Sequence, residues 1–285
     1  LPQPIRGGVV LGERLADMAK RYGGDVSTIH RPWGEVFTPS ENEQALREKP
    51  AKVVAIVHAE TSTGAEQPLD EIAKIVHNHG AILIVDAVTS LGGVPLSVDE
   101  IGIDICYSGT QKCISAPPGL GPITFNERAL NLMRSRKAPV TSWYLDMSLV
   151  QAYWGPNRTY HHTAPITMNY ALYEALRIIA EEGIENRWAR HRANSEMFWE
   201  GLEDLNLKCF IPKEHRLTSL CTIQIPEGVD DAAVRKSLLE DYNIEISGGL
   251  GSLKGKIWRV GLMGYTSRKE NILLLLAALK KILYK

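Results

Sequence analysis

The segment Ala81-Ile82-Leu83-Ile84-Val85-Asp86 is an unbroken apolar run of strand length that ends in a carboxylate. A second apolar run, residues 103–107 (IDICY), is followed directly by residues 108–112 (SGTQK), which end in Lys112. Continuous runs of this kind are typical of strands that are buried on both faces of a parallel sheet. Because ligands of open α/β sheets bind beyond the carboxyl ends of the strands, we expect Asp86 and Lys112 to share one site.

An amine and a carboxylate in these positions suit the chemistry of pyridoxal phosphate. A lysine amine can condense with the cofactor aldehyde and move a proton, and a carboxylate beside the pyridine nitrogen keeps that nitrogen protonated. Taken singly, each residue favours a simpler interpretation. Most lysines are solvated surface groups, and an aspartate at a strand end is usually a turn former or a helix cap.

The flanking sequence predicts an α/β fold with a mostly parallel sheet. Residues 53–57 (VVAIV) form a third strand-like run, and it ends at the hydroxyl-rich loop 58–64 (HAETSTG). Residues 69–79 have the pattern of a crossover helix that Gly80 ends, which makes a parallel βαβ unit. A further amphipathic helix is expected over residues 11–22, and a short strand over 122–125.

The C-terminal half predicts connecting helices followed by a small α/β domain. Helical spacing runs from Pro165 to Gly183 and again over residues 184–205. Beyond it we expect strands at 220–225, 244–246 and 257–260, a helix over 232–242, and a closing helix capped by Thr266 or Ser267. The resulting division is a large cofactor-binding domain at 1–163, connecting helices at 164–204 and a small C-terminal domain at 205–285.

Composition excludes several classes of partner. The 32 Lys and Arg against 33 Asp and Glu give a formal net charge of -1, so there is no electrostatic footprint for nucleic acid or an anionic membrane. No apolar stretch reaches the roughly 20 residues that span a bilayer. The four cysteines form no CxxC pair, which indicates free thiols in a reducing compartment.

Five ordered motifs give the chain a family resemblance. They are residues 85–93 (VDAVTSLGG), 107–112 (YSGTQK) with 116–119 (APPG), 160–163 (YHHT), 248–251 (GGLG) and 259–264 (RVGLMG). In this order they resemble the class V aminotransferases, in particular the alanine–glyoxylate (serine–pyruvate) branch, from about Gly12 to the C-terminus. The resemblance implies the fold-type I architecture of pyridoxal phosphate transferases. It also implies transfer of an amino group from L-alanine or L-serine to glyoxylate or pyruvate.

The resemblance assigns roles around the cofactor. Lys112 would form the Schiff base and shuttle the proton, and Asp86 would pair with the pyridinium nitrogen. Val88 would pack on one face of the ring, Thr61 would donate a hydrogen bond to the phenolic oxygen, and Gln111 would contribute to phosphate binding.

Three further residues extend the site by the same resemblance. Arg259 would grip the substrate carboxylate, a task that suits a planar guanidinium. Tyr160 and Thr163 would reach the phosphate of the neighbouring subunit's cofactor, so the resemblance implies a homodimer with shared active sites. Adjacent His161 and His162 seldom hold one ion without further ligands, so we interpret both as structural and expect no metal.

Three alternatives stay open on sequence alone. A relative acting on 3-hydroxykynurenine would use the same Lys112, Asp86 and Arg259 with another side-chain pocket. A cysteine desulfurase is less favoured, because Cys209 and Cys221 fall in strand-like stretches. The chain opens LPQPIRGG without a signal or transit pattern, so we expect an N-terminally incomplete domain. An incomplete domain also leaves open a non-catalytic chain that only dimerises. We expect an intracellular location, and the sequence does not distinguish peroxisome, mitochondrion and cytosol.

Overall fold

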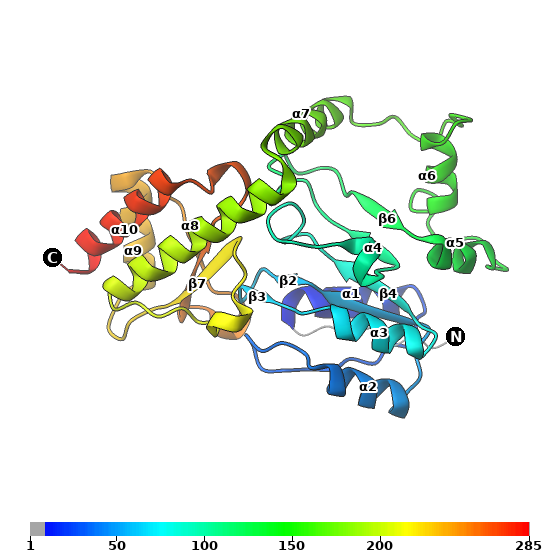
Figure 1. Cartoon of the computed structure of the whole chain (residues 1–285), viewed down its shortest axis with the longest axis horizontal. Helices are drawn as coiled ribbons and strands as arrows, with labels where there is room; N and C mark the ends of the chain where they lie inside the picture. The colour runs from blue at the N-terminus through cyan, green and yellow to red at the C-terminus, as the bar shows by residue number, and fades with distance from the viewer. Residues whose placement is uncertain (1–8, 285) are drawn as a thin grey trace.

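The computed structural model describes residues 9–284, and its larger sheet carries the strand ends that the sequence singled out. The sheet has the order β1 (Val53–Val57), β4 (Ile82–Asp86), β5 (Ile105–Tyr107) and β6 (Ile123–Phe125). The first three strands are parallel, and β6 pairs antiparallel with β5 (Figure 1). This arrangement confirms the predicted α/β class. A small antiparallel hairpin, β2 (Ala59–Glu60) and β3 (Ala65–Glu66), follows β1.

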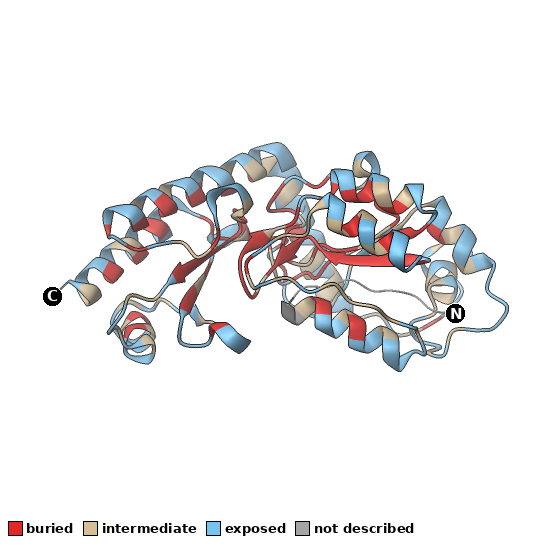
Figure 2. Ribbon diagram, turned by 90° about the horizontal axis from the view of Figure 1, so that it is seen from below, coloured by how far each residue is buried: buried red, intermediate tan, exposed pale blue. Residues whose placement is uncertain are grey.

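Helices cover this sheet and bury its apolar residues. The crossover helix is α3 (Asp70–Asn78), and it ends at a turn in which Gly80 has φ 71°. Helix α2 (Pro39–Glu48) packs against α3, and α1 (Val9–Arg21) contacts β1. Figure 2 shows the buried strands lying between these helices, whose outer faces are exposed. Along the chain, the short α4 (Val98–Ile101) connects β4 to β5, and α5 (Glu127–Arg134) and α6 (Met147–Trp154) follow β6.

Two long helices lead from the larger sheet to a second core. Helix α7 (Ile166–Glu182) ends at Gly183, whose φ of 80° allows the chain to turn directly into α8 (Ile184–Asp204). Helix α8 runs diagonally across Figure 1 and lies beside α10 (Lys269–Leu283). Its N-terminal half therefore lies near the larger sheet, and its C-terminal half belongs to the second core.

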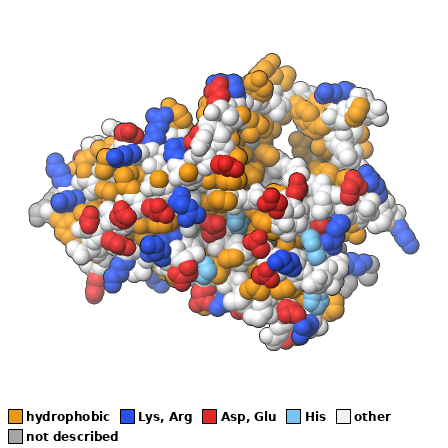
Figure 3. Space-filling model, viewed as in Figure 1, with side chains coloured by type: hydrophobic (Ala, Val, Ile, Leu, Met, Phe, Trp, Pro, Cys, Tyr) orange, Lys and Arg blue, Asp and Glu red, His pale blue; other side chains and the backbone are white. Residues whose placement is uncertain are grey.

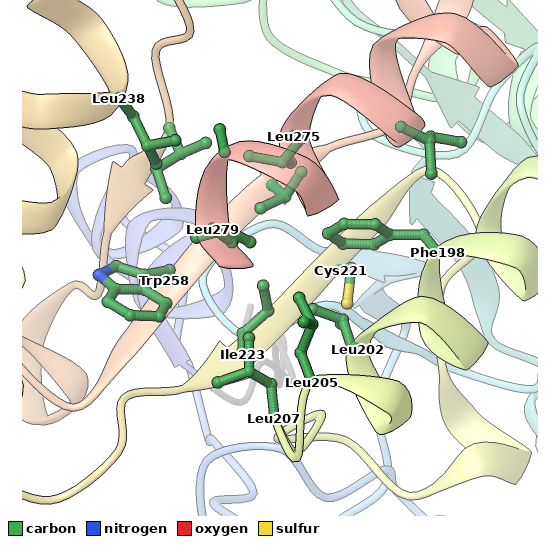
Figure 4. Packing of buried hydrophobic residues seen from close by; sticks show 14 of the residues in the cluster. Phe198, Leu202, Leu205, Leu207, Cys221, Ile223, Leu238, Trp258, Leu275 and Leu279 are labelled. Atoms are coloured by element: carbon green, nitrogen blue, oxygen red, sulfur yellow. The ribbon is translucent and has the colours of Figure 1, made fainter. Parts of the chain in front are cut away.

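The second core surrounds a three-stranded antiparallel sheet of order β7 (Leu220–Gln224), β9 (Ile257–Gly261) and β8 (Ser247–Gly248). Helix α9 (Asp231–Tyr242) and α10 pack with it. Figure 4 shows side chains from α8, β7, β9 and α10 converging, with Phe198 and Trp258 fully buried among leucines. Short 3-10 turns occupy η1 (Lys213–His215), η2 (Gly251–Leu253) and η3 (Gly264–Thr266).

Two local expectations are wrong. The strand expected over 244–246 lies instead at β8, because Asn243 ends α9 with φ 55° and the chain then pairs with β9 only at Ser247 and Gly248. The closing helix begins at Lys269 with Arg268 at its N-cap and no side-chain cap. The division at residues 163 and 204 stays a prediction.

Candidate active site

The carboxyl ends of the three parallel strands meet at one edge of the larger sheet. The strand register pairs Val57 with Asp86 and Asp86 with Tyr107. The loops that carry Thr61 and Lys112 leave the sheet at this same edge, after β1 and β5. This is the position at which open α/β sheets bind ligands.

Asp86 is a buried carboxylate with both oxygens oriented. Its side chain is 6% exposed. The backbone N–H of Val88 donates to Oδ1 at 2.9 Å, and the hydroxyl of Tyr107 donates to Oδ2 at 2.7 Å. Burial raises the pKa of Asp86, and these two hydrogen bonds oppose that rise. A buried carboxylate with remaining lone pairs is suited to accept from a cationic nitrogen, so Asp86 fits a pyridinium partner.

Lys112 is half-buried in the turn that follows β5. Burial lowers the pKa of its amine, and the nearby positive charge of Arg259 lowers it further. A lowered pKa leaves more of the amine neutral near pH 7, which is the form that attacks a carbonyl. The neighbouring Cys113 is fully buried, and burial raises the pKa of its thiol to about 11. Cys113 therefore stays protonated, and the reactive group of this turn is the amine.

Arg259, on β9 of the second sheet, reaches across to the loop after β1. Its Nε donates to the carbonyl of Gly248 at 2.8 Å, and its Nη1 donates to the carbonyl of Thr61 at 3.2 Å. Burial lowers the pKa of Arg259, and the charge of buried Glu60 opposes that change. Among residues 9–284 no carboxylate lies within 4.0 Å of the guanidinium nitrogens. The guanidinium is thus partly desolvated without an acidic partner.

Thr61 lies on the loop after β1 and Gln111 on the loop after β5, and the two residues differ in exposure. The hydroxyl of Thr61 is 2.7 Å from the hydroxyl of Thr89, which lies in the turn after β4. Gln111 is exposed beside Lys112, and a Cβ on Gly109 would lie only 2.7 Å from its Oε1. A glycine at position 109 therefore leaves room for the Gln111 amide.

Tyr160 and Thr163 contact each other and lie apart from this cluster. Their hydroxyls are 3.0 Å apart, and Tyr160 is 72% exposed. They lie on the segment that connects α6 to α7 along the outside of the molecule (Figure 1). Next to them, His161 stacks on Trp143 with ring centroids 4.3 Å apart, and its Nδ1 lies 2.9 Å from that of His162. The structure gives this pair a packing role.

Sequence reasoning missed two residues of the cluster. Tyr107, which orients Asp86, was quoted within a motif without a role, although its place opposite Asp86 follows from the strand register. Thr89 was likewise missed as the partner of Thr61. Within the described part of the chain, no group of three potential ligands could hold a metal ion. Among residues 9–284, no helix has the length and apolarity needed to cross a bilayer.

Comparisons with known proteins identify the family. The family model described as Aminotransferase class-V matches residues 14–273. The (S)-ureidoglycine–glyoxylate transaminase of Bacillus subtilis is 39% identical over 292 residues, covering 96% of this chain and 70% of that protein. The alanine–glyoxylate aminotransferase of Rattus norvegicus is 40% identical over 266 residues, covering 92% of this chain and 64% of that protein.

Solved structures give the same result. The crystal structure of an alanine–glyoxylate aminotransferase from Nostoc sp. superposes with a TM-score of 0.95 at 51% identity, covering 99% of this chain and 76% of that one. A ureidoglycine–glyoxylate aminotransferase from Bacillus subtilis also gives 0.95, at 40% identity, covering 99% of this chain and 74% of that one.

A parallel sheet with its polar edge at Asp86, matched over nearly the whole chain by these enzymes, defines a fold-type I pyridoxal phosphate transferase. Within that class, the chain belongs to the class V aminotransferases. Pyridoxal 5'-phosphate is accordingly its cofactor, and small molecules are its substrates.

Proposed function

We propose that the chain transfers the amino group of a small L-amino acid, L-alanine or L-serine, to glyoxylate. With L-alanine, the donor leaves as pyruvate and the acceptor leaves as glycine, so the two half-reactions balance without an added oxidant. We take glyoxylate as the acceptor because two similar enzymes, the (S)-ureidoglycine–glyoxylate transaminase and the alanine–glyoxylate aminotransferase, both carry it in their names. The cofactor supplies the electron sink, and the residues of the chain bind, orient and move protons.

The observation that carries this proposal is the guanidinium of Arg259, which has no carboxylate within 4.0 Å among residues 9–284. Its two named hydrogen bonds go to backbone carbonyls, and both are neutral acceptors. A partly buried arginine without a carboxylate partner is poised to take one from outside the chain, and its planar fork can donate two parallel hydrogen bonds. Amino acids and 2-oxo acids both carry an α-carboxylate, so one residue serves both half-reactions.

The cofactor residues follow from the geometry at the strand ends. We assign Lys112 to covalent attachment and to proton transfer at Nζ, and Asp86 to the pyridinium nitrogen. Val88 would lie against the ring, Thr61 beside the phenolic oxygen and Gln111 at the phosphate. The lowered pKa of Lys112 supports its role, because proton transfer needs an amine that is neutral part of the time.

We further propose that the enzyme works as a homodimer with shared sites. Tyr160 and Thr163 have no contact with the Asp86 cluster in their own chain, which a role at a partner subunit's cofactor explains. Figure 3 shows hydrophobic side chains gathered over α7 and around the hollow beside it. Large exposed apolar residues of this region are Trp143, Tyr144, Leu145, Trp154, Ile166, Tyr170, Tyr173 and Leu176. An apolar surface of this kind is typical of an obligate interface.

A second candidate donor is (S)-ureidoglycine. The relative from Bacillus subtilis that carries this name is 39% identical over 96% of the chain, close to the 40% of the rat alanine–glyoxylate enzyme. Both donors present an α-amino group and an α-carboxylate to the same residues. The choice between them therefore depends on the donor side-chain pocket.

The test is a donor panel with one acceptor. Purified chain is mixed with pyridoxal phosphate, glyoxylate and L-alanine, L-serine or (S)-ureidoglycine, and glycine formation is followed by chromatography. In parallel samples without glyoxylate, we expect a visible absorbance band that depends on Lys112 and disappears on addition of the preferred donor. A folded chain that shows no such band would favour a non-catalytic, dimerising role.

A further inference from the structure

Helix α8 presents a polar face to the loops after β4 and β5 and to the segment that follows β9. Arg187, Arg190, His191 and Asn194 follow the i, i+3, i+4, i+7 spacing that places side chains on one helix face. Arg187 is 2% exposed and His191 is fully buried. A buried charge is costly unless it is paired and hydrogen-bonded, so the contacts of this face need an explanation.

Arg187 binds the two loops that carry the cofactor residues. Its Nε donates to the carbonyl of Gly92 at 3.1 Å, and its Nη2 donates to the carbonyl of Cys113 at 2.6 Å. Gly92 belongs to the turn after Asp86, and Cys113 follows Lys112 in the chain. One side chain therefore fixes both loops relative to α8.

Arg190 binds the segment that follows the strand of Arg259. Its Nη1 donates to the carbonyl of Gly264 at 3.1 Å and to that of Ser267 at 2.6 Å. His191 holds the same segment, because its Nε2 accepts from the N–H of Gly264 at 2.8 Å. Burial lowers the pKa of His191 to about 4, so at neutral pH this nitrogen is free to accept.

Glu182 joins the two arginines. Its Oε2 lies 2.9 Å from Nη1 of Arg187, and its Oε1 lies 2.5 Å from Nε of Arg190. Glu182 is the last residue of α7, directly before the turn at Gly183. Its pKa is lowered, first by the hydrogen bond from Arg190 and also by Arg187, so it stays ionised.

We propose that Glu182, Arg187 and Arg190, which we call the arginine bridge, are positioning residues for the reaction. Arg187 sets the lysine loop and thereby the cofactor. Arg190 sets the end of β9 and thereby the guanidinium of Arg259 that takes the substrate carboxylate. This inference rests on the function proposed above, since it assumes the roles of Lys112 and Arg259. If the bridge had only a structural role, its loss would lower Tm and would change cofactor affinity and KM together.

The test compares Arg187→Gln with Arg190→Gln in the full chain. Three quantities are measured: the dissociation constant of pyridoxal phosphate by titration, KM and kcat for L-alanine, and Tm. Because each charged hydrogen bond is worth roughly a factor of 10 or more, we expect Arg187→Gln to weaken cofactor binding about 10-fold with KM little changed. By the same estimate, Arg190→Gln should raise KM about 10-fold while cofactor affinity stays within roughly twofold.

Arg192→Gln is the matched control. Arg192 lies on α8 like the bridge, but it is exposed and pairs only loosely with exposed Glu196, at 4.0 Å, so its loss should change none of the three quantities. Arg187→Lys and Arg190→Lys keep the charge and should each restore part of the lost effect. If Arg187→Gln does not fold, Arg187→Lys supplies the cofactor measurement in its place.

Two outcomes would overturn the proposal in different ways. If both Gln variants change cofactor affinity and KM in proportion to their loss of Tm, the bridge is structural and the inference fails alone. If the wild-type chain shows no cofactor binding that depends on Lys112, the proposed function fails, and the positioning role fails with it.

Discussion

The two parts of the proposed site differ in how far their polar side chains are buried and hydrogen-bonded within the chain itself. Asp86 is buried and receives two hydrogen bonds from its own chain, from Val88 and Tyr107. Tyr160 is 72% exposed, and within residues 9–284 its hydroxyl has a hydrogen-bond partner only in that of Thr163. The strand-end half, Asp86 with its two donors, is therefore held within the chain, whereas Tyr160 and Thr163 stay exposed, as their proposed contact with a partner subunit's cofactor requires.

The difference follows from where each half lies in the fold. Asp86 ends a strand whose neighbours are buried, and the parallel register brings Tyr107 to it. Tyr160 lies on an irregular segment outside the sheet, so no ladder of hydrogen bonds fixes it. The proposed shared site would account for both observations, with one subunit orienting the ring and the other completing the phosphate contacts.

The largest expected effect comes from Lys112→Ala, which removes the reactive amine from the self-contained half. Loss of both the covalent link and the proton shuttle should lower kcat by roughly 1,000-fold or more. Glycine formation from L-alanine and glyoxylate measures it. Lys74→Ala, an exposed lysine paired with Glu71 on α3, serves as the control and should keep full activity. Substantial activity in Lys112→Ala would remove the lysine from its assigned role.

Arg259→Gln should have the second largest effect, on substrate and on Lys112 together. Loss of a bidentate charged contact should lower kcat/KM about 10- to 100-fold, mainly through KM. The charge of Arg259 also lowers the pKa of Lys112, so its removal should raise that pKa toward the ordinary value. Cofactor uptake by the apo chain needs the neutral amine, and its pH midpoint should therefore move to higher pH. An unmoved midpoint would contradict the electrostatic link.

The third prediction tests the incomplete half by mixing subunits. Two variants are mixed, Lys112→Ala and the double variant Tyr160→Phe, Thr163→Ala. Each should be weakly active alone, and the double variant should have about 10-fold lower activity than the wild-type chain because it loses phosphate contacts. If the sites are shared, a dimer with one subunit of each kind contains one intact site. Random mixing should then restore roughly a quarter of the wild-type activity. If mixing gives only the sum of the separate activities, Tyr160 and Thr163 do not act on a partner's cofactor.

Much of the strand-end half could be predicted from sequence, because its residues lie where apolar runs stop. Periodicity and Gly80 were enough to place the crossover helix and, with it, the parallel strands that end near Asp86 and Lys112. The role of Tyr107 needed the register, which fixes a cross-strand neighbour that spacing along the chain does not reveal.

The errors came from segments whose conformation depends on distant contacts. Ser267 has the residue type of a helix cap, yet Asn194 donates to its hydroxyl and Arg190 to its carbonyl, so α10 starts later without a side-chain cap. Local sequence carries no information about such partners on α8. For the same reason, the lack of an ion pair at Arg259 among residues 9–284 could be recognised only in the folded chain.

The smallest effect that still separates the two halves is expected from Tyr107→Phe. The Tyr107 hydroxyl lowers the pKa of Asp86 against the opposing effect of burial, so its removal should raise that pKa further. A carboxylate with a higher pKa becomes protonated at a higher pH, and a neutral acid pairs poorly with a pyridinium nitrogen. Cofactor affinity should therefore fall about 3- to 10-fold near neutral pH, in line with one lost hydrogen bond to a charge, and the loss should grow as the pH falls. Titration of pyridoxal phosphate at several pH values measures it, with exposed Tyr22→Phe as the comparison. A loss of affinity independent of pH would mean that the Tyr107 hydroxyl does not act through the pKa of Asp86, and no loss at all would mean that Asp86 owes its orientation to the backbone N–H of Val88.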